Sequence, residues 1–400
     1  MKKLAICVAM SFAFPAFAQV DEAKTADEPW AQGRPKQKEA LKFAPVPAHP
    51  IPTAAADLPI KKMKLPPGFK AEVYQAGILD ARGMREGDKG TIFVSSLFVA
   101  GKIYAITNQG GKRELLTIAE KLFLPNGIEF YKGALYVATP KDITRYDNIE
   151  ANLKNPPKPV MVKDGLPGDI PHGWKFIKMG PDGKMYVPVG APCNICMPSD
   201  RHAQIFRMNP DGSGWESVVQ GMRNTVGFDW HPKTKELWFG DNQRDWLSED
   251  LPHDELNRVT KKGQHFGYPY CHGGQLTDPE LGWGKSCKDY TSPAVLLGPH
   301  AAPLGMRFYT GKMFPAKYQN AIFLTRHGPW NRTQKLGADV VAVFIDGKGR
   351  AKMEPFLTGL IEKNEYLGRP ADVHVMKDGS LLVSDDHNGA IYRITYSGSK

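Results

Sequence analysis

One pattern recurs six times along this chain and constrains its fold more than any other feature. Each copy has a small or polar start, a short apolar strand, a turn rich in Gly or Asp, and a second apolar strand. The copies begin at residues 81, 125, 172, 224, 303 and 369, with spacings of 44, 47, 52, 79 and 66 residues. The shorter spacings match one four-stranded propeller blade per copy, and the longer ones indicate insertions. The sequence therefore predicts an all-β, six-bladed β-propeller with inserted loops.

The start of each copy is where chemistry is expected. In a propeller the first strand of every blade lines a central channel, so residues at the same register converge at one mouth. The polar residues at this register are Arg82, Asn126, His172, Arg223, Asn224 and Arg369. A channel rim that is polar only because it holds water is the alternative. The combination predicts a cup that binds anions and oxygen atoms, with His172 as its candidate base.

An acidic insertion, residues 240–257, follows the fourth copy. It carries Glu249, Asp250, Asp254 and Glu255. Their oxygens, together with loop carbonyls, are ligands that calcium prefers. The spacing and central glycine of an EF-hand are absent, and an acidic surface loop is the alternative.

Two further segments are expected near the same mouth. Residues 326–332 include Trp330, an aromatic side chain, and Arg332, another cation. His300 precedes the fifth copy and is a further candidate for the mouth.

Other chemistries find little support in the sequence. Motifs for serine hydrolases, zinc proteases, phosphate-binding loops and dinucleotide-binding folds are missing. Asp385 and Asp386 are adjacent, and neighbouring strand residues face opposite sides, so the pair cannot flank one glycosidic bond. A turn or capping role is expected for them.

The N-terminus has the layout of a secretory signal peptide. Lys2 and Lys3 precede an apolar run, residues 4–14, and the sequence Ala-Phe-Ala ends at residue 18. Residues 1–18 are therefore predicted to be removed on export to the periplasm. Residues 19–60 are rich in Pro and Ala and predict a leader or linker, and residues 61–400 the propeller domain.

Charge and hydropathy narrow the range of partners. The formal net charge is +10, and loss of Lys2 and Lys3 lowers it to +8. The positive residues are spread along the chain without a basic block interleaved with aromatics, which disfavours nucleic acid. No stretch after the signal peptide is long and apolar enough to predict a membrane span.

Four cysteines remain after the signal peptide: Cys193, Cys196, Cys271 and Cys287. An even count in an exported protein suggests disulfides. Proximity favours Cys193–Cys196 and Cys271–Cys287, although three pairings are open. Covalent haem is disfavoured because Met197, not His, follows Cys196, and a zinc site of four thiolates is a further alternative.

Several motifs, in this order and spacing, resemble the soluble PQQ-dependent sugar dehydrogenases, and most closely the L-sorbosone and aldose sugar dehydrogenase branch. The similarity extends from about residue 65 to residue 396. The motifs that carry it are residues 221–224 (Gly-Met-Arg-Asn), 254–257 (Asp-Glu-Leu-Asn), 302–309 (Ala-Pro-Leu-Gly-Met-Arg-Phe-Tyr) and 329–332 (Pro-Trp-Asn-Arg).

The resemblance implies an oxidation mechanism. His172 would be the general base that takes the proton from the sugar C1 hydroxyl while hydride passes to C5 of pyrroloquinoline quinone (PQQ). It also implies a calcium ion that polarises the quinone, held largely by carbonyls near Glu249 and Asp250. Arginines suit the three PQQ carboxylates. The residues that the resemblance places around the cofactor are Arg223, Asn224, Arg332, Arg369 and Asn126.

Two other functions remain open from the sequence. One is a calcium-dependent lactonase on a similar propeller, and the other is a non-catalytic propeller that binds a carbohydrate or a protein. The sequence leaves the preferred sugar, the oligomeric state and the electron acceptor, a quinone or a cytochrome, undetermined.

Overall fold

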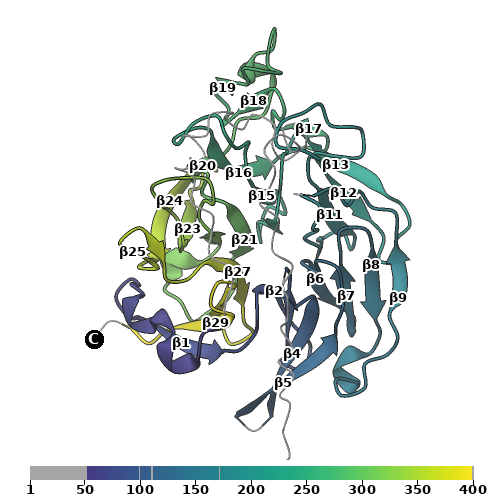
Figure 1. Ribbon diagram of the computed structural model, residues 1–400, viewed down its shortest axis with the longest axis vertical. Coiled ribbons are helices and arrows are strands. Elements are labelled where there is room, and N and C mark those ends of the chain that lie inside the picture. Colours follow the sequence, from purple (N-terminus) through teal and green to yellow (C-terminus); the bar gives the residue numbers. More distant parts are fainter. Residues whose placement is uncertain (1–51, 99, 110, 171, 399–400) are drawn as a thin grey trace, which may run out of the picture.

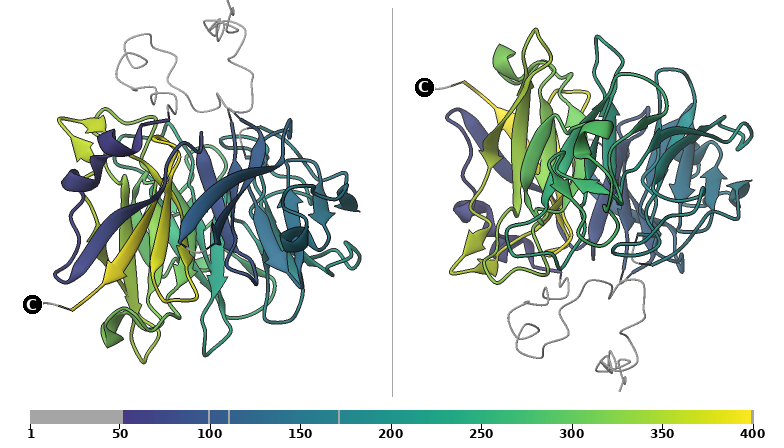
Figure 2. Two further views of the ribbon diagram at one scale, coloured as in Figure 1. Left: turned by 90° about the horizontal axis from the view of Figure 1, so that it is seen from below. Right: turned by 90° about the horizontal axis from the view of Figure 1, so that it is seen from above.

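Six β-sheets arranged around a central axis make up the protein, as a computed structural model shows (Figure 1). The structure describes residues 52–98, 100–109, 111–170 and 172–398. The signal peptide and most of the leader lie outside these residues. The predicted six-bladed propeller is confirmed. Seen from the side, the strands run between the two faces of the ring (Figure 2).

Each blade is an antiparallel sheet whose strands follow one another from the inside outwards. The strands of the first three blades are β2 (Ala81–Glu86), β3 (Ile92–Ser96), β4 (Lys102–Gln109) and β5 (Lys112–Ala119); β6 (Ile128–Tyr131), β7 (Ala134–Ala138), β8 (Ile143–Tyr146) and β9 (Val160–Lys163); β10 (Lys178–Met179), β11 (Met185–Val189), β12 (Gln204–Met208) and β13 (Glu216–Gln220). A short strand, β17 (Gln264–His265), extends the third sheet by pairing in parallel with β13.

The next two blades and the last follow the same plan. Their strands are β14 (Gly227–Trp230), β15 (Leu237–Asp241), β16 (His253–Val259) and β20 (Val295–Pro299); β21 (Pro303–Phe308), β22 (Ile322–Arg326), β23 (Asp339–Ile345) and β24 (Ala351–Leu357); β27 (Pro370–Val375), β28 (Leu381–Asp385), β29 (Ala390–Tyr396) and β1 (Phe69–Gln75). Because β1 is the outer strand of the last blade and pairs with β29, the two ends of the folded chain close the ring.

Short elements occupy the connections. They are two hairpins, β18 (Cys271–His272) with β19 (Leu276–Thr277) and β25 (Ile361–Glu362) with β26 (Glu365–Tyr366), and the 3-10 helices η1 (Ala55–Asp57), η2 (Pro59–Lys62), η3 (Ile149–Ala151), η4 (Cys287–Asp289) and η5 (Ala316–Tyr318). No helix among the described residues combines the length and hydropathy needed to cross a membrane.

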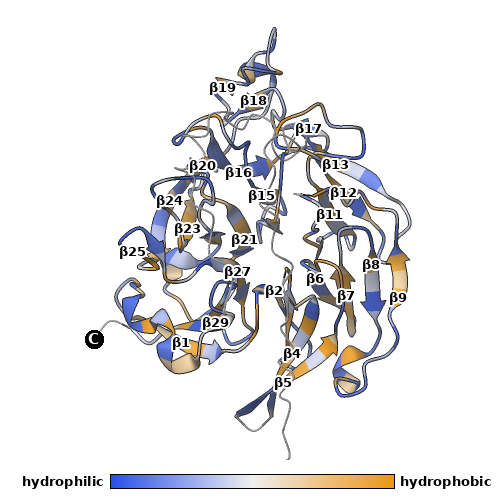
Figure 3. Ribbon diagram, viewed as in Figure 1, coloured by the Kyte–Doolittle hydropathy of each residue, from blue (hydrophilic) through white to orange (hydrophobic). Residues whose placement is uncertain are grey.

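The hydrophobic core is divided among the six interfaces between neighbouring blades. Each interface holds one apolar cluster with residues from both sheets. Phe93 of β3 and Val137 of β7, for example, belong to the same cluster. Because both faces of a blade are covered, β7 is buried along its whole length, and hydrophobic residues colour β7 and β23 in Figure 3.

Charges of alternating sign form a ring around the channel, with one residue from each innermost strand. The six residues are Arg85, Glu129, Lys178, Asp229, Arg307 and Asp372. Arg85 and Lys178 each bind the carboxylate of the next blade at 2.7 Å. Asp372 lies 3.5 Å from Arg307 and 3.6 Å from Arg85, which joins the last blade to the fifth and the first. These ion pairs cross blade boundaries, so they support ring closure.

Residues 52–60, assigned to the leader from the sequence, lie against the last blade. The Thr53 amide donates to the Asn388 carbonyl at 2.8 Å, and Leu58 is buried beside Ala390 and Tyr392. Contact with the propeller therefore begins before residue 61.

Both predicted disulfides are confirmed, Cys193–Cys196 and Cys271–Cys287. The first closes a short turn between β11 and β12. The second joins β18 to η4 in the long insertion of the fourth blade, at the end of the molecule that is uppermost in Figure 1.

Candidate functional site

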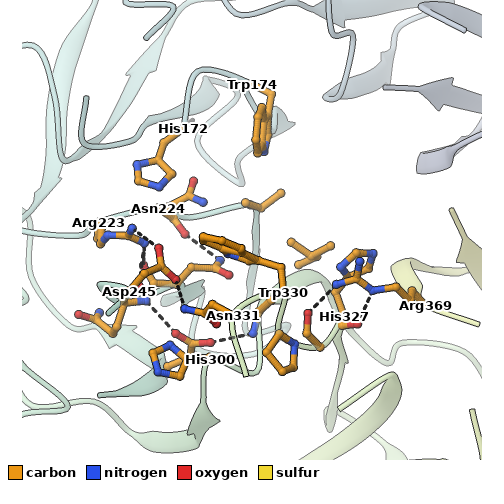
Figure 4. A pocket seen from close by; sticks show the side chains of 18 of the residues that line it. His172, Trp174, Arg223, Asn224, Asp245, His300, His327, Trp330, Asn331 and Arg369 are labelled. Atoms are coloured by element: carbon orange, nitrogen blue, oxygen red, sulfur yellow. Dashed lines mark hydrogen bonds and ion pairs between the residues drawn. The ribbon is translucent and has the colours of Figure 1, made fainter. Parts of the chain in front are cut away.

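A cavity of about 450 Å³ opens where the innermost strands begin, within the size range of small-molecule sites. We call it the cup (Figure 4). Seven residues singled out from the sequence line it, although the chain separates them widely: His172, Arg223, Asn224, Asp254, His300, Trp330 and Arg369. Arg82, from the same register argument, lines it as well. The convergence expected from the repeats is therefore present.

His172 is held in one orientation and one tautomer. Its Nδ1 lies 2.8 Å from the Ala191 carbonyl oxygen, which can only accept, so Nδ1 carries the proton. Within the described chain Nε2 has no hydrogen-bond partner, and its lone pair is available to the cup. Burial and then the charge of Arg223 lower the pKa of His172 well below its ordinary value. His172 is therefore a neutral base at neutral pH.

Hydrogen bonds from Lys175 hold the loop that carries His172. The buried Lys175 Nζ donates to the carbonyls of Pro167, at 2.6 Å, and Gly173. Burial lowers the pKa of Lys175 to about 7. A side chain at Gly190 would come within 2.6 Å of the His172 Cβ, so the close approach of the β11–β12 loop requires glycine there.

Arg223 organises its side of the cup. Its guanidinium donates to Asn194, to the carbonyls of Asn242 and Gln243, and to the Asp245 carboxylate, which accounts for all five N–H groups. The Asp245 contact is 2.9 Å long. Arg223 therefore supplies positive charge to the cup, while its hydrogen bonds go to the protein.

The opposite wall contains a buried ion-pair network. Asp386 accepts from Arg82 at 2.5 Å and from His327 at 2.8 Å. Burial alone would raise the pKa of Asp386, but His327 and Arg82 outweigh it and hold that pKa below its ordinary value. Burial and the charge of Arg369 lower the pKa of His327 to about 4, so His327 is neutral.

Arg369 is the cation in the cup best placed to meet an anion. Its Nε and Nη2 donate to the carbonyls of His327 and Gly328. Among the described residues, Nη1 has no acceptor and no carboxylate forms an ion pair with this guanidinium. The buried positive charge therefore favours an anionic ligand.

Two polar atoms in the cup wall lack partners. Trp174 Nε1 and Asn331 Oδ1 are buried and make no hydrogen bond in the described structure. Such atoms are rare in folded proteins unless a ligand or water completes them. One is a donor and the other an acceptor, so together they fit a ligand with both kinds of polar group.

Aromatic pairs flank the opening. Trp330 packs edge-on against Trp246 with ring centroids 5.0 Å apart, and Phe98 packs edge-on against Trp174 at 5.3 Å. Trp330 is 40% exposed and Phe98 53%. These faces can stack on a sugar ring or on a planar cofactor.

The structure places five of the sequence-predicted residues outside the cup wall. Asn126 lies deeper in the channel and donates to the Lys175 carbonyl. Arg332 binds the Glu249 carbonyl and the Asp250 carboxylate, because these loops meet beside the cup. Glu249 and Asp250 are exposed. Glu255 is buried and accepts from the Gly273 amide and from Asn257.

Asp254 is the one acidic residue of the predicted calcium set that faces the cup. Its carboxylate oxygens accept from the amides of Gln243 and Ala302, both at 2.7 Å, and burial raises its pKa to about 7. The described residues contain no group of three or more His, Cys, Asp or Glu side chains arranged around a metal. Side chains alone therefore do not form a calcium cage, and most ligands of a bound ion would be carbonyls.

Sequence reasoning gave no individual role in the site to several residues that shape the cup, chiefly Asn194, Asp245, His327 and Asp386, although Asp245 and His327 lie in the two insertions expected near the mouth. The first three lie in loops between strands two and three of a blade, whose paths the repeat period does not specify. Asp386 follows directly on β28. A turn or capping role is expected for it from the sequence, whereas the structure pairs it with Arg82. Asp385, its neighbour, does cap, since it accepts from the Arg369 amide at 2.9 Å.

The fold and the cup define a six-bladed propeller with a cationic, histidine-bearing ligand site at one mouth. Residues 167–393 match the family described as Glucose / Sorbosone dehydrogenase, and the chain belongs to this family of sugar dehydrogenases. It is also 32% identical over 363 residues to an uncharacterized protein of Borreliella burgdorferi, covering 86% of this chain and 93% of that protein.

Solved structures share the fold. The PQQ domain of pyranose dehydrogenase from Coprinopsis cinerea, in its holo form, superimposes with a TM-score of 0.72 and 18% identity, over 83% of this chain and 97% of that one. The PQQ-bound aldose sugar dehydrogenase from Streptomyces coelicolor gives a TM-score of 0.60 and 19% identity, over 84% and 100% of the two chains.

Proposed function

We propose that this sugar dehydrogenase uses PQQ to oxidise an aldose or a related aldehyde sugar, with His172 as the general base. The observation that carries the proposal is the neutral His172, fixed by Ala191, with Nε2 available to a cup that contains the unpaired Arg369 cation. When bound, PQQ supplies the hydride acceptor. A hydride leaves a carbon readily only as its hydroxyl proton departs, and a neutral imidazole can take that proton at neutral pH.

The donors in the cup fit a planar, anionic quinone. In the described part of the chain, Arg369 Nη1 donates no hydrogen bond and Arg82 donates only from Nη1, to Asp386. Both guanidiniums therefore have N–H groups left for carboxylates. Trp174 Nε1 and Asn331 Oδ1 offer a donor and an acceptor to the remaining polar atoms. Asn224 lines the same wall. A lactonase would instead need carboxylates gathered around a central ion.

The direct test is an activity assay on the purified protein loaded with PQQ and calcium. Reduction of an artificial dye with at least one aldose, and none without PQQ, would support the proposal. Hydrolysis of a lactone without PQQ would favour the lactonase instead. Unchanged sugar binding without turnover, also after Arg369→Ala, would favour a non-catalytic binding propeller.

Trp330 is expected to bind the sugar by stacking. We expect Trp330→Ala to raise the KM for the sugar about 2- to 10-fold, the range that an aromatic contact contributes. Trp330→Phe keeps a stacking face and should stay near the original value. Initial rates across sugar concentrations measure both. An unchanged KM in Trp330→Ala would show that Trp330 does not contact the sugar.

Calcium is a further part of the proposal, with Asp254 as its carboxylate ligand and loop carbonyls as the others. After chelation, activity should return on addition of calcium, and Asp254→Asn should raise the half-activating concentration about tenfold or more. Asp250→Asn serves as the comparison because Asp250 is exposed and binds Arg332. A larger effect of Asp250→Asn than of Asp254→Asn would indicate that calcium binds at the exposed loop instead of at Asp254.

The two disulfides are consistent with an oxidising compartment, and we propose the periplasm as the site of action.

A further inference from the structure

The connection between β11 and β12 supports the cup from beside His172. The Ala191 carbonyl accepts from His172 at 2.8 Å, and the Ala191 amide donates to the Arg223 carbonyl at 2.8 Å. The orientation of His172 is therefore tied to the backbone of Arg223.

Asn194, three residues further along this connection, holds the side chain of Arg223. Its backbone oxygen accepts from Arg223 Nε at 2.8 Å and its Oδ1 from Nη2 at 2.9 Å. The same Oδ1 accepts from the Asp245 amide at 2.7 Å, and Asn194 Nδ2 donates to the Asp245 carbonyl at 3.1 Å. Asn194 is 1% exposed. One buried side chain therefore joins three chain segments that line the cup.

The Cys193–Cys196 disulfide encloses Asn194 in a ring of four residues. Tyr268, from the long insertion of the fourth blade, covers this ring, and its hydroxyl accepts from the Cys196 amide at 3.2 Å. A ring this short restricts the unfolded chain much less than the 17-residue ring of Cys271–Cys287 does. The main effect of the short ring is therefore on the local geometry of the folded state.

We propose that Asn194, fixed by the Cys193–Cys196 disulfide, is a positioning residue that sets Arg223 and, through Arg223 and Ala191, the orientation of His172. The kinetic consequence rests on the proposed function. Asn194 does not exchange protons with the sugar. It determines the position of the His172 imidazole, and small displacements of a reacting group lower the rate of the chemical step strongly.

The kinetic test compares three variants with the wild-type protein. Asn194→Ala and the double variant Cys193→Ser/Cys196→Ser should each lower kcat about 10- to 100-fold. The sugar KM and the Kd for PQQ should stay within about threefold, because the groups that bind them remain. The double variant Cys271→Ser/Cys287→Ser is the matched control, and it should lower the melting temperature with little change in kcat.

A second readout does not depend on PQQ or turnover. Hydrogen exchange followed by mass spectrometry on the unliganded protein should show faster exchange in Asn194→Ala at residues 189–196, 221–226 and 242–246. Exchange in the last blade should not change.

The inference is overturned if exchange in these segments is unchanged, or if it rises while kcat stays at the wild-type value. If the wild-type protein itself shows no turnover, the proposed function fails. In that case the hydrogen-exchange result alone shows whether Asn194 holds the Arg223 and Ala191 segments in place.

Discussion

Replacement of His172 with alanine is expected to lower kcat by about 100- to 10,000-fold, the contribution that a positioned general base makes. The His172 imidazole is neutral, its tautomer is fixed by the Ala191 carbonyl, and its Nε2 is available to the cup. PQQ binding should change little, because the guanidiniums of Arg82 and Arg369 remain. Steady-state dye reduction measures the rate, and an optical titration measures binding.

The pH dependence follows from the same imidazole. Burial and Arg223 lower the pKa of His172, so the base stays unprotonated as the pH falls through 6.5. The rate limited by this group should therefore be constant from about pH 8 to below pH 6.5 and decline only under more acidic conditions.

His231→Gln is the matched control. His231 follows β14 at the other end of the channel, where it packs edge-on against Phe308. Its replacement should leave kcat unchanged. Retention of more than about a tenth of the wild-type kcat by His172→Ala would exclude His172 as the base.

Breaking the alternating charge ring is expected to give the largest loss of stability. Asp229→Asn removes the carboxylate that pairs with the Lys178 ammonium at 2.7 Å, and leaves a cation whose side chain is only 20% exposed without its partner. The free energy of unfolding should fall by about 3–5 kcal/mol. Urea unfolding followed by tryptophan fluorescence measures it. The double variant Lys178→Met/Asp229→Asn should recover part of the loss, because the unpaired charge is gone.

The contribution of Asp229 to stability depends on pH with a definite sign. Burial would raise the pKa of Asp229, but Lys178 and Arg307 outweigh it and lower that pKa below the ordinary value. The stabilisation is therefore complete above about pH 4 and is lost as the pH falls through the lower, folded-state pKa.

An exposed ion pair provides the comparison. Lys352 and Glu354 lie on the outer strand of the fifth blade, with side chains 79% and 40% exposed. Lys352→Met should change the free energy of unfolding by less than about 0.5 kcal/mol. A similar small effect of Asp229→Asn would mean that the ring does not support closure.

The repeat explains why the centre of the site was predictable. Once six copies are aligned, geometry brings Arg82, His172, Arg223 and Arg369 to one mouth without any knowledge of the loops. The sequence also contains the residues of the charge ring, since the first strand of every copy includes one of them and their signs alternate, although β2 carries Arg82 and Glu86 beside Arg85. The sequence analysis did not use that alternation.

The loops mark the limit of that reasoning. Nothing in residues 240–257 indicates that Asp254 faces the cup while Glu255, its neighbour, pairs with Asn257 and Gly273 behind it. Adjacent strand residues point to opposite sides, but the register of β16 is set by pairing with β15 and β20, which the sequence does not show. Likewise, Arg332 meets Asp250 because two insertions touch.

The measurement that tests the central claim most directly is a titration of the purified protein with PQQ in the presence of calcium, followed by optical absorbance. The account predicts saturable binding at one equivalent, weakened by Arg369→Ala, and a spectral change on addition of an aldose that His172→Ala does not show. Absence of PQQ binding to the folded wild-type protein would contradict it.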